Sequence, residues 1–141
     1  MINNKLLMST SSLCTRYKSI IGIPENQIFL YTSMTNELDR QVITRWRLSS
    51  HKLFVETGRR KIPQPPRDNR LCIVCRVVED EHHAIYDCTA HNFIRPEYED
   101  LLSTNNTVAK MLNPQSHQVV KLVAGYLRKI EQNMEDLQML Q

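Results

Sequence analysis

The chain has 141 residues, a net charge of +3 and a hydrophobic fraction of 41%. This length fits one domain, or one small domain with a helical arm. It contains no run of about 18 apolar residues that could cross a membrane, and its N-terminus lacks the charged-then-apolar pattern of a signal peptide. We therefore expect no membrane partner and no secretion.

The first predicted element is an N-terminal helical arm over residues 1–36. The hydroxyl residues at 9–12 weaken this helix, because their side chains compete for backbone hydrogen bonds. Gly22 and Pro24 interrupt it. Its apolar residues fall on a rough helical stripe, at Leu6, Leu13, Tyr17, Ile20 and Ile21.

Residues 37–57 are predicted to form one long helix. Asn36 can cap its start, and Gly58 suits the position that ends it. We expect its tryptophan, the only one in the chain, to anchor the core. Apolar residues recur along it at near-helical spacing, at Leu38, Val42, Trp46 and Leu53.

A proline-rich connector and a metal module follow. Residues 59–70, RRKIPQPPRDNR, are not helical, because three prolines within four positions force extended geometry. The segment LCIVCRVV, residues 71–78, has the β-branched content of a short metal-pinned hairpin. Acidic residues at 79–81 then mark the start of a helix that carries His83 and Cys88.

Four residues in this module have metal-ligand spacing: Cys72, Cys75, His83 and Cys88, which read C-x2-C-x7-H-x4-C. A close cysteine pair followed by a histidine and a cysteine supplies the four donors of a tetrahedral Zn²⁺ site. Buried cysteines that act as small hydrophobes would not produce this spacing, and a disulfide would leave one local cysteine over. The pattern predicts a structural zinc site whose closed coordination leaves no position for catalysis.

The histidine ligand has alternatives. His83 leaves the H-x4-C spacing common in small zinc knuckles, whereas its neighbour His82 leaves H-x5-C. His91, three residues past Cys88, is a further candidate. We favour His83 as the ligand and place His82 beside the site or in solvent.

The C-terminal helices are expected over residues 97–141. Pro96, with the acidic residues that follow it, marks a helix start. Asn106 can open a second short helix, and Asn113 with Pro114 can open a third. That third helix has the clearest helical period in the chain, at Val119, Leu122, Val123, Tyr126, Ile130 and Leu137.

Together these elements predict a mainly α fold. A zinc knuckle, made of a short metal-pinned hairpin plus a helix, lies between a long helix in the N-terminal half and the C-terminal helices. The predicted division is an arm at 1–36, the basic helix, connector and zinc module at 37–96, and C-terminal helices at 97–141. Few large apolar side chains occur in 59–96, so we expect zinc to supply its folding free energy, on the order of 10 kcal/mol.

Positive charge is concentrated before and within the metal module. Residues 40–76 contain ten lysines or arginines and two acidic residues, so the rest of the chain is net negative. A basic segment beside a zinc knuckle is what a phosphate-binding surface needs, although it can also be a solvated face. No aromatic residue lies between Arg59 and Arg76, so this segment does not indicate base stacking.

Further short strings accompany the metal pattern between Arg45 and Cys88: RWRL, SHKL, ETGR, PRD, and EDE before His83. The whole run is similar to the zinc-binding C-terminal tail of reverse transcriptases from LINE-type retrotransposons, the endonuclease–reverse transcriptase family. The resemblance covers roughly residues 40–130. It implies the same four metal ligands and basic contacts to RNA or DNA, for which the candidates are Arg59, Arg60, Lys61 and Arg67.

The sequence lacks the paired aspartates of that family's polymerase and any endonuclease constellation, so we expect no enzyme activity and no small-molecule substrate. The favoured function is a non-catalytic zinc module that contacts RNA or DNA in the nucleus or cytoplasm, where cysteines stay reduced. The alternatives are a protein-interaction module that binds a partner through the C-terminal helices, and a non-functional transposon remnant. His51 is expected to be a packing or surface residue on the long helix.

Overall fold

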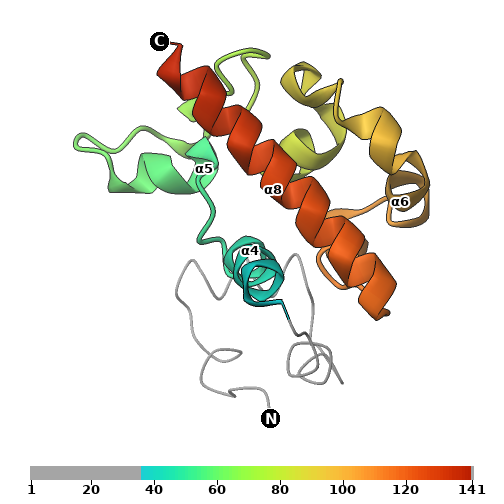
Figure 1. Cartoon of the computed structure of the whole chain (residues 1–141). Helices are drawn as coiled ribbons and strands as arrows, with labels where there is room; N and C mark the ends of the chain where they lie inside the picture. The colour runs from blue at the N-terminus through green and yellow to red at the C-terminus, as the bar shows by residue number, and fades with distance from the viewer. Residues whose placement is uncertain (1–35, 141) are drawn as a thin grey trace.

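The structure, a computed structural model, describes residues 36–140, which form a mainly helical domain (Figure 1). Helix α8 (His117–Met139) runs across the molecule, and α4 (Glu37–Arg47) packs against it. Within 36–140 there is no β-strand, and no helix is both long and apolar enough to span a membrane. The predicted mainly α fold, with the Cys/His segment between helices, is confirmed. The predicted arm lies outside the described residues, apart from Asn36.

Helix α4 begins as predicted and ends earlier than predicted. The Asn36 side chain accepts hydrogen bonds from the backbone N–H groups of Leu38 (2.9 Å) and Asp39 (3.2 Å). The helix stops at Arg47, and Ser49 takes a left-handed conformation with φ of 56°. The single helix predicted over 37–57 is therefore wrong, because a poor helix-forming serine pair interrupts it.

A new short helix, α5 (Phe54–Thr57), follows this break. The Glu79 carboxylate accepts the Phe54 N–H at 2.7 Å, and the Glu79 carbonyl accepts the Val55 N–H at 3.2 Å. A residue from the metal module thus satisfies the free N–H groups at the start of α5. This tertiary contact could not be read from local spacing.

Gly58 does not end the helix in a left-handed conformation, because its φ is −62°. Its role is close approach: a Cβ at Gly58 would lie 2.8 Å from Cδ of Arg70 and 3.0 Å from the Phe54 ring. The buried Arg70 donates hydrogen bonds to the carbonyls of Val55 (2.7 Å) and Pro65 (3.1 Å). The missing side chain at Gly58 leaves room for this arginine.

The segment predicted as a hairpin has hairpin pairing. Leu71 and Val78 form an antiparallel bridge, and Cys72 N–H donates to the Val77 carbonyl at 2.7 Å. The predicted helix then follows. Its π-helical part, η3 (His83–Asp87), carries His83 and ends immediately before Cys88.

The C-terminal part contains α6 (Glu99–Thr104), α7 (Val108–Met111) and α8. The caps of α7 and α8 are Thr107 and Ser116, whose hydroxyls accept from backbone N–H groups at 3.1 and 3.3 Å. Asn106 and Asn113, the predicted N-caps, therefore precede the observed caps by one and three residues. The Asn113 amide oxygen instead accepts a hydrogen bond from Arg47 at 3.3 Å. The domain also contains short 3₁₀ helices: η1 (Gly58–Arg60), η2 (Arg67–Asn69), η4 (Thr89–His91) and η5 (Arg95–Tyr98). Pro96 lies at the start of η5, where a helix start was predicted.

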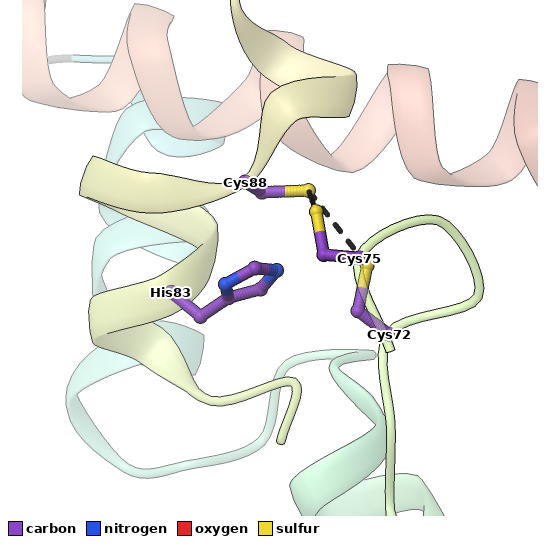
Figure 2. Close-up of side chains that lie close together, drawn as sticks. All are labelled: Cys72, Cys75, His83 and Cys88. Atoms are coloured by element: carbon purple, nitrogen blue, oxygen red, sulfur yellow. Dashed lines mark hydrogen bonds between the residues drawn. The ribbon is translucent and has the colours of Figure 1, made fainter. Parts of the chain in front are cut away.

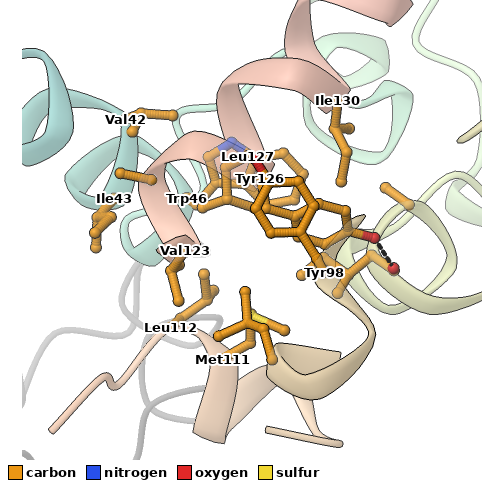
Figure 3. Packing of buried hydrophobic residues seen from close by; sticks show 14 of the residues in the cluster. Val42, Ile43, Trp46, Tyr98, Met111, Leu112, Val123, Tyr126, Leu127 and Ile130 are labelled. Carbon is orange, nitrogen blue, oxygen red and sulfur yellow. Dashed lines mark hydrogen bonds between the residues drawn. The ribbon is translucent and has the colours of Figure 1, made fainter. Parts of the chain in front are cut away.

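One hydrophobic core joins α4, η3 and the C-terminal helices to α8 (Figure 3). Trp46 is fully buried, which confirms its predicted role as a core anchor. The Tyr126 ring lies 5.0 Å from the Tyr98 ring, and its hydroxyl donates to the Ile85 carbonyl in η3. Residues of α8 face this core at helical spacing, at Val120, Val123, Ala124, Leu127, Ile130 and Met134.

Two polar contacts connect α4 and α8: Arg128 pairs with the buried Asp39 at 2.8 Å, and Glu131 contacts the end of α4. Its carboxylate accepts the Trp46 indole N–H at 2.9 Å and the Arg45 guanidinium at 2.8 Å, and only 16% of its side chain is exposed. One turn further along, Glu135 pairs with Lys52 at 2.7 Å, with 45% of its side chain exposed. The Glu131 contact is therefore largely shielded from solvent, whereas the Glu135 contact is exposed.

Glu131→Ala should lower the free energy of unfolding by about 1–3 kcal/mol, because it leaves the buried indole N–H without an acceptor. The matched change Glu135→Ala should cost less than about 0.5 kcal/mol, because exposed ion pairs contribute little. Urea unfolding of zinc-supplemented protein at neutral pH measures both. Equal losses in the two variants would contradict the assignment of Glu131 as a stabilising acceptor of the buried Trp46 indole.

Candidate metal centre

Two of the candidate ligands lie on the hairpin turn. Arg76 N–H donates to the Cys72 carbonyl at 2.9 Å, which closes the turn between the two cysteines. Arg76 has a φ of 60°, a left-handed conformation that costs a non-glycine residue roughly 1–2 kcal/mol. The turn brings the sulfurs of Cys72 and Cys75 to the same side (Figure 2).

The other two candidate ligands are brought together by the π-helical turn. In an α-helix, residues five apart point about 140° away from each other. Here Cys88 N–H donates to the His83 carbonyl at 2.7 Å, a five-residue bond that brings the two residues to adjacent positions. The Asp80 carboxylate caps the same segment by accepting the His83 N–H at 2.9 Å. The widened turn thus aims the His83 ring and the Cys88 sulfur at the hairpin (Figure 2).

The four side chains converge at distances suited to a metal ion. One ligand atom from each of Cys72, Cys75, His83 and Cys88 lies within 4.8 Å of all the others. The Cys88 sulfur is 3.8 Å from that of Cys72 and 3.9 Å from that of Cys75. Tetrahedral coordination with Zn–S bonds of about 2.3 Å places sulfurs about 3.8 Å apart, whereas a disulfide requires about 2.05 Å.

His83 provides an independent test of whether a metal fits. Its Nε2 is buried and has no hydrogen-bond partner within residues 36–140. A buried, unpaired ring nitrogen carries a desolvation cost that a metal bond would remove. Burial lowers the pKa of His83, although Asp80 and Asp87 oppose the shift, so the ring favours the neutral form that metals bind.

The thiols differ in environment. Burial is the main cause that raises the pKa of Cys88 to about 12, and the nearby sulfurs of Cys72 and Cys75 add to it. The pKa of Cys75 is lowered, chiefly by a hydrogen bond with the Thr89 hydroxyl at 3.3 Å. Three thiolates this close repel one another, and a divalent cation among them would remove that repulsion. The donor set, three sulfurs and one imidazole, is the set that Zn²⁺ prefers in structural sites.

The alternative histidines do not join this group. His82 is exposed, and its Nδ1 lies 3.0 Å from the Asp87 carboxylate. His91 is buried away from the four ligand atoms, with its Nδ1 2.9 Å from the Asn133 amide nitrogen. Burial is the main cause that lowers the pKa of His91 to about 4. Of the three candidates, His83 is the one that the structure places with the cysteines.

A buried polar pair that was not predicted from the sequence, His51 and Glu81, holds the metal module against the core. His51, expected on the surface or in packing of a long helix, lies in the loop after α4 and is buried; its Nε2 is 2.8 Å from the Glu81 carboxylate. Its Nδ1 accepts the Leu53 N–H at 3.3 Å, so the hydrogen on Nε2 can be donated to Glu81. His51 and Glu81 lie 30 residues apart, and neither has a sequence pattern that indicates a buried pair, so this contact was not predicted.

Arg95 caps the carboxyl end of the π-helical turn. Its guanidinium donates to the carbonyls of Cys88 (2.6 Å), Ile85 (3.2 Å) and Ala84 (3.4 Å). A cation at this end adds hydrogen bonds to the last carbonyls of the turn and interacts favourably with the helix dipole. Its position just before Pro96 gave no indication of this role.

Of the four residues predicted to contact nucleic acid, three are exposed and one is half-buried. Arg60 and Lys61 are exposed, and Lys61 Nζ lies 4.6 Å from the Phe54 ring centroid. Arg67 is exposed and 3.6 Å from Asp80, whereas Arg59 is half-buried against Glu56 at 3.4 Å. Other cations of the basic segment serve the fold: Arg45, Arg47, Lys52 and Arg70 bind groups within the domain.

No protein-family model, curated protein or solved structure matches this chain. Membership of a family is therefore not shown, and the similarity to retrotransposon tails stays a prediction. The proposed function therefore rests on the geometry of the Cys/His group.

Strong chelation should unfold residues 67–96 and leave α4 and α8 helical, because α4 and α8 pack directly against each other and the buried core takes only Ala84, Ile85 and Ile94 from that segment. Binding of a structural Zn²⁺ contributes on the order of 10 kcal/mol to folding of a small motif. Circular dichroism and hydrogen exchange, before and after chelation, measure the two regions separately. A protein that keeps full protection in 67–96 after its metal is removed would refute this expectation.

His83→Ala should reduce bound zinc from one ion per chain to a small fraction, because it removes a ligand. The neighbouring change His82→Ala should leave zinc binding intact, because His82 lies outside the ligand group. Elemental analysis of the purified variants gives the stoichiometry, and Co²⁺ substitution reports thiolate coordination. Loss of metal in His82→Ala with retention in His83→Ala would reverse the assignment.

Proposed function

We propose that this chain is a non-catalytic module that holds a structural Zn²⁺ and contacts RNA or DNA through the cations beside it. The observation that carries the metal proposal is the convergence of Cys72, Cys75, His83 and Cys88 within 4.8 Å, with a buried His83 nitrogen that lacks another partner. Four protein ligands fill a tetrahedral site, so the ion has a structural role.

The exposed cations around the metal segment support a role in phosphate contact. Arg60, Lys61, Arg67 and Arg76 are exposed and lie on the connector and hairpin turn that lead to and carry the cysteines. The metal module would hold these side chains at fixed positions on the surface. Fixed cations neutralise phosphates with a smaller loss of conformational entropy than cations on a disordered chain.

The similarity to the tails of LINE-type reverse transcriptases supports the same proposal. Several strings of that similarity have structural roles here: His51 of SHKL pairs with Glu81 of EDE, and the glycine of ETGR leaves room for Arg70. Residues of the similar run thus contact one another in the fold. We propose that the chain derives from such a tail and acts in the nucleus or cytoplasm.

Binding of a labelled RNA or DNA should weaken steeply with salt, because phosphate contacts release counterions. Replacing Arg60 and Lys61 together with alanine should reduce the slope of log affinity against log salt by about 1.4–1.8. Replacing the exposed Lys110 and Lys121, which lie on the C-terminal helices, should leave the slope unchanged. Arg59 is left in place because its partner Glu56 is buried.

The second candidate is a protein-interaction module that uses the C-terminal helices. The specific observation that favours it is the exposure of Leu122, Met139 and Leu140 on or directly after α8. Absence of any nucleic-acid binding at low salt would reject the first proposal and favour this one. Equal effects of the two double variants would also reject the proposed cation surface.

A further inference from the structure

Two surface hollows lie next to the metal ligands. A groove of about 400 Å³ lies between α5, the hairpin turn and the C-terminal part of α8, with Cys72 and Cys88 at its wall. A second, more open hollow is lined by Cys75 and His83. The four ligands thus contribute to two separate surfaces of the module.

The two hollows differ in charge. Lys52 and Lys61 line the groove together with Glu79, whose carboxylate accepts a backbone N–H. Lys52 is already paired with Glu135, so Lys61 is the cation that an anionic ligand can engage. The second hollow is lined by Asp80 and Asp87, and no lysine or arginine lines it. Complementarity of charge therefore favours an anionic ligand in the groove and disfavours it in the second hollow.

Between its charged groups the groove is apolar. The Phe54 ring at its wall is covered by the Lys61 ammonium, which lies 4.6 Å from the ring centroid. A ligand with a flat face and a negative charge can replace the ammonium over this ring and pair with it. The remaining apolar wall is formed by Leu71, Ile73, Val74, Met134 and Leu137.

We propose that this groove takes one unpaired nucleotide of RNA or DNA, with its base against Phe54 and Val74 and its phosphate on Lys61. The inference rests on the proposed function and deepens it, because it specifies single strands. A paired base is stacked within its duplex and reaches such a groove only if it is extruded. The groove has the volume of a small-ligand site, which suits a single nucleotide better than a duplex.

The test compares labelled ligands of equal length on the full zinc-loaded chain. Single strands of about 12 nucleotides, in RNA and in DNA, are titrated beside an abasic strand and a duplex. The abasic strand has the phosphates but no bases, so it measures the charge contribution alone. Base-bearing single strands should bind at least about fivefold tighter than the abasic strand, and the RNA and DNA series identify the preferred sugar.

Two valines of the hairpin provide a matched pair of variants. Val74 lines the groove and is 45% exposed, whereas Val77 lines the second hollow and is 48% exposed. Val74→Ser should weaken base-bearing strands about fivefold and leave the abasic strand unchanged. Val77→Ser should change neither by more than about twofold. Phe54→Leu, which keeps apolar volume but removes the ring, should resemble Val74→Ser, and zinc content with circular dichroism verifies each fold.

The outcomes separate this inference from the proposed function. If abasic and base-bearing strands bind alike, or if the two valine variants behave alike, the groove does not hold a base, while salt-dependent binding still supports nucleic-acid contact. If no strand binds at low salt, both proposals fall.

Discussion

The π-helical turn His83–Asp87 connects the Cys/His group to the hydrophobic core. On one side its five-residue hydrogen bond brings His83 beside Cys88, and on the other side the carbonyl of the buried Ile85 accepts the Tyr126 hydroxyl of α8. A regular α-helix would direct the two ligands apart. The geometry of the Cys/His group and the packing of α8 therefore depend on the same irregular turn, and Arg95 donates further hydrogen bonds to the carbonyls of Ile85 and Cys88.

Charge in the basic segment has two separate uses. Arg45 and Lys52 pair with glutamates of α8, and Arg47 and Arg70 bind backbone carbonyls from buried positions. A net count over the segment therefore overstates the positive surface that a partner would meet. The cations that remain exposed belong to the connector and the hairpin turn. Their position beside the Cys/His group limits the proposed phosphate surface to one part of the domain.

Local patterns were enough to predict that Cys72, Cys75, His83 and Cys88 come together, and to predict most helices. The four ligands occupy 17 residues, and the Asn36 cap and the period of α8 depend on neighbours a few positions away. The error over residues 37–57 has a local cause and a long-range one: the serine pair at 49–50 ends α4, and Glu79, 25 residues from Phe54, starts α5. The buried pair of His51 and Glu81 and the contact of Trp46 with Glu131 span 30 and 85 residues, so no sequence window contains both partners.

The packing of α4 against α8 also has a consequence for how the chain is made. Residues 85 positions apart meet in this contact, so α4 leaves the ribosome well before its partner has been synthesised. Translation adds about 5–20 residues per second, so the apolar face around Trp46 stays uncovered for roughly 4–17 s before its contact residues on α8 are synthesised. The Cys/His segment is complete much sooner, because its ligands span 17 residues. During translation, the Cys/His group is therefore complete before the core can form, and a nascent chain with an exposed α4 is vulnerable to aggregation.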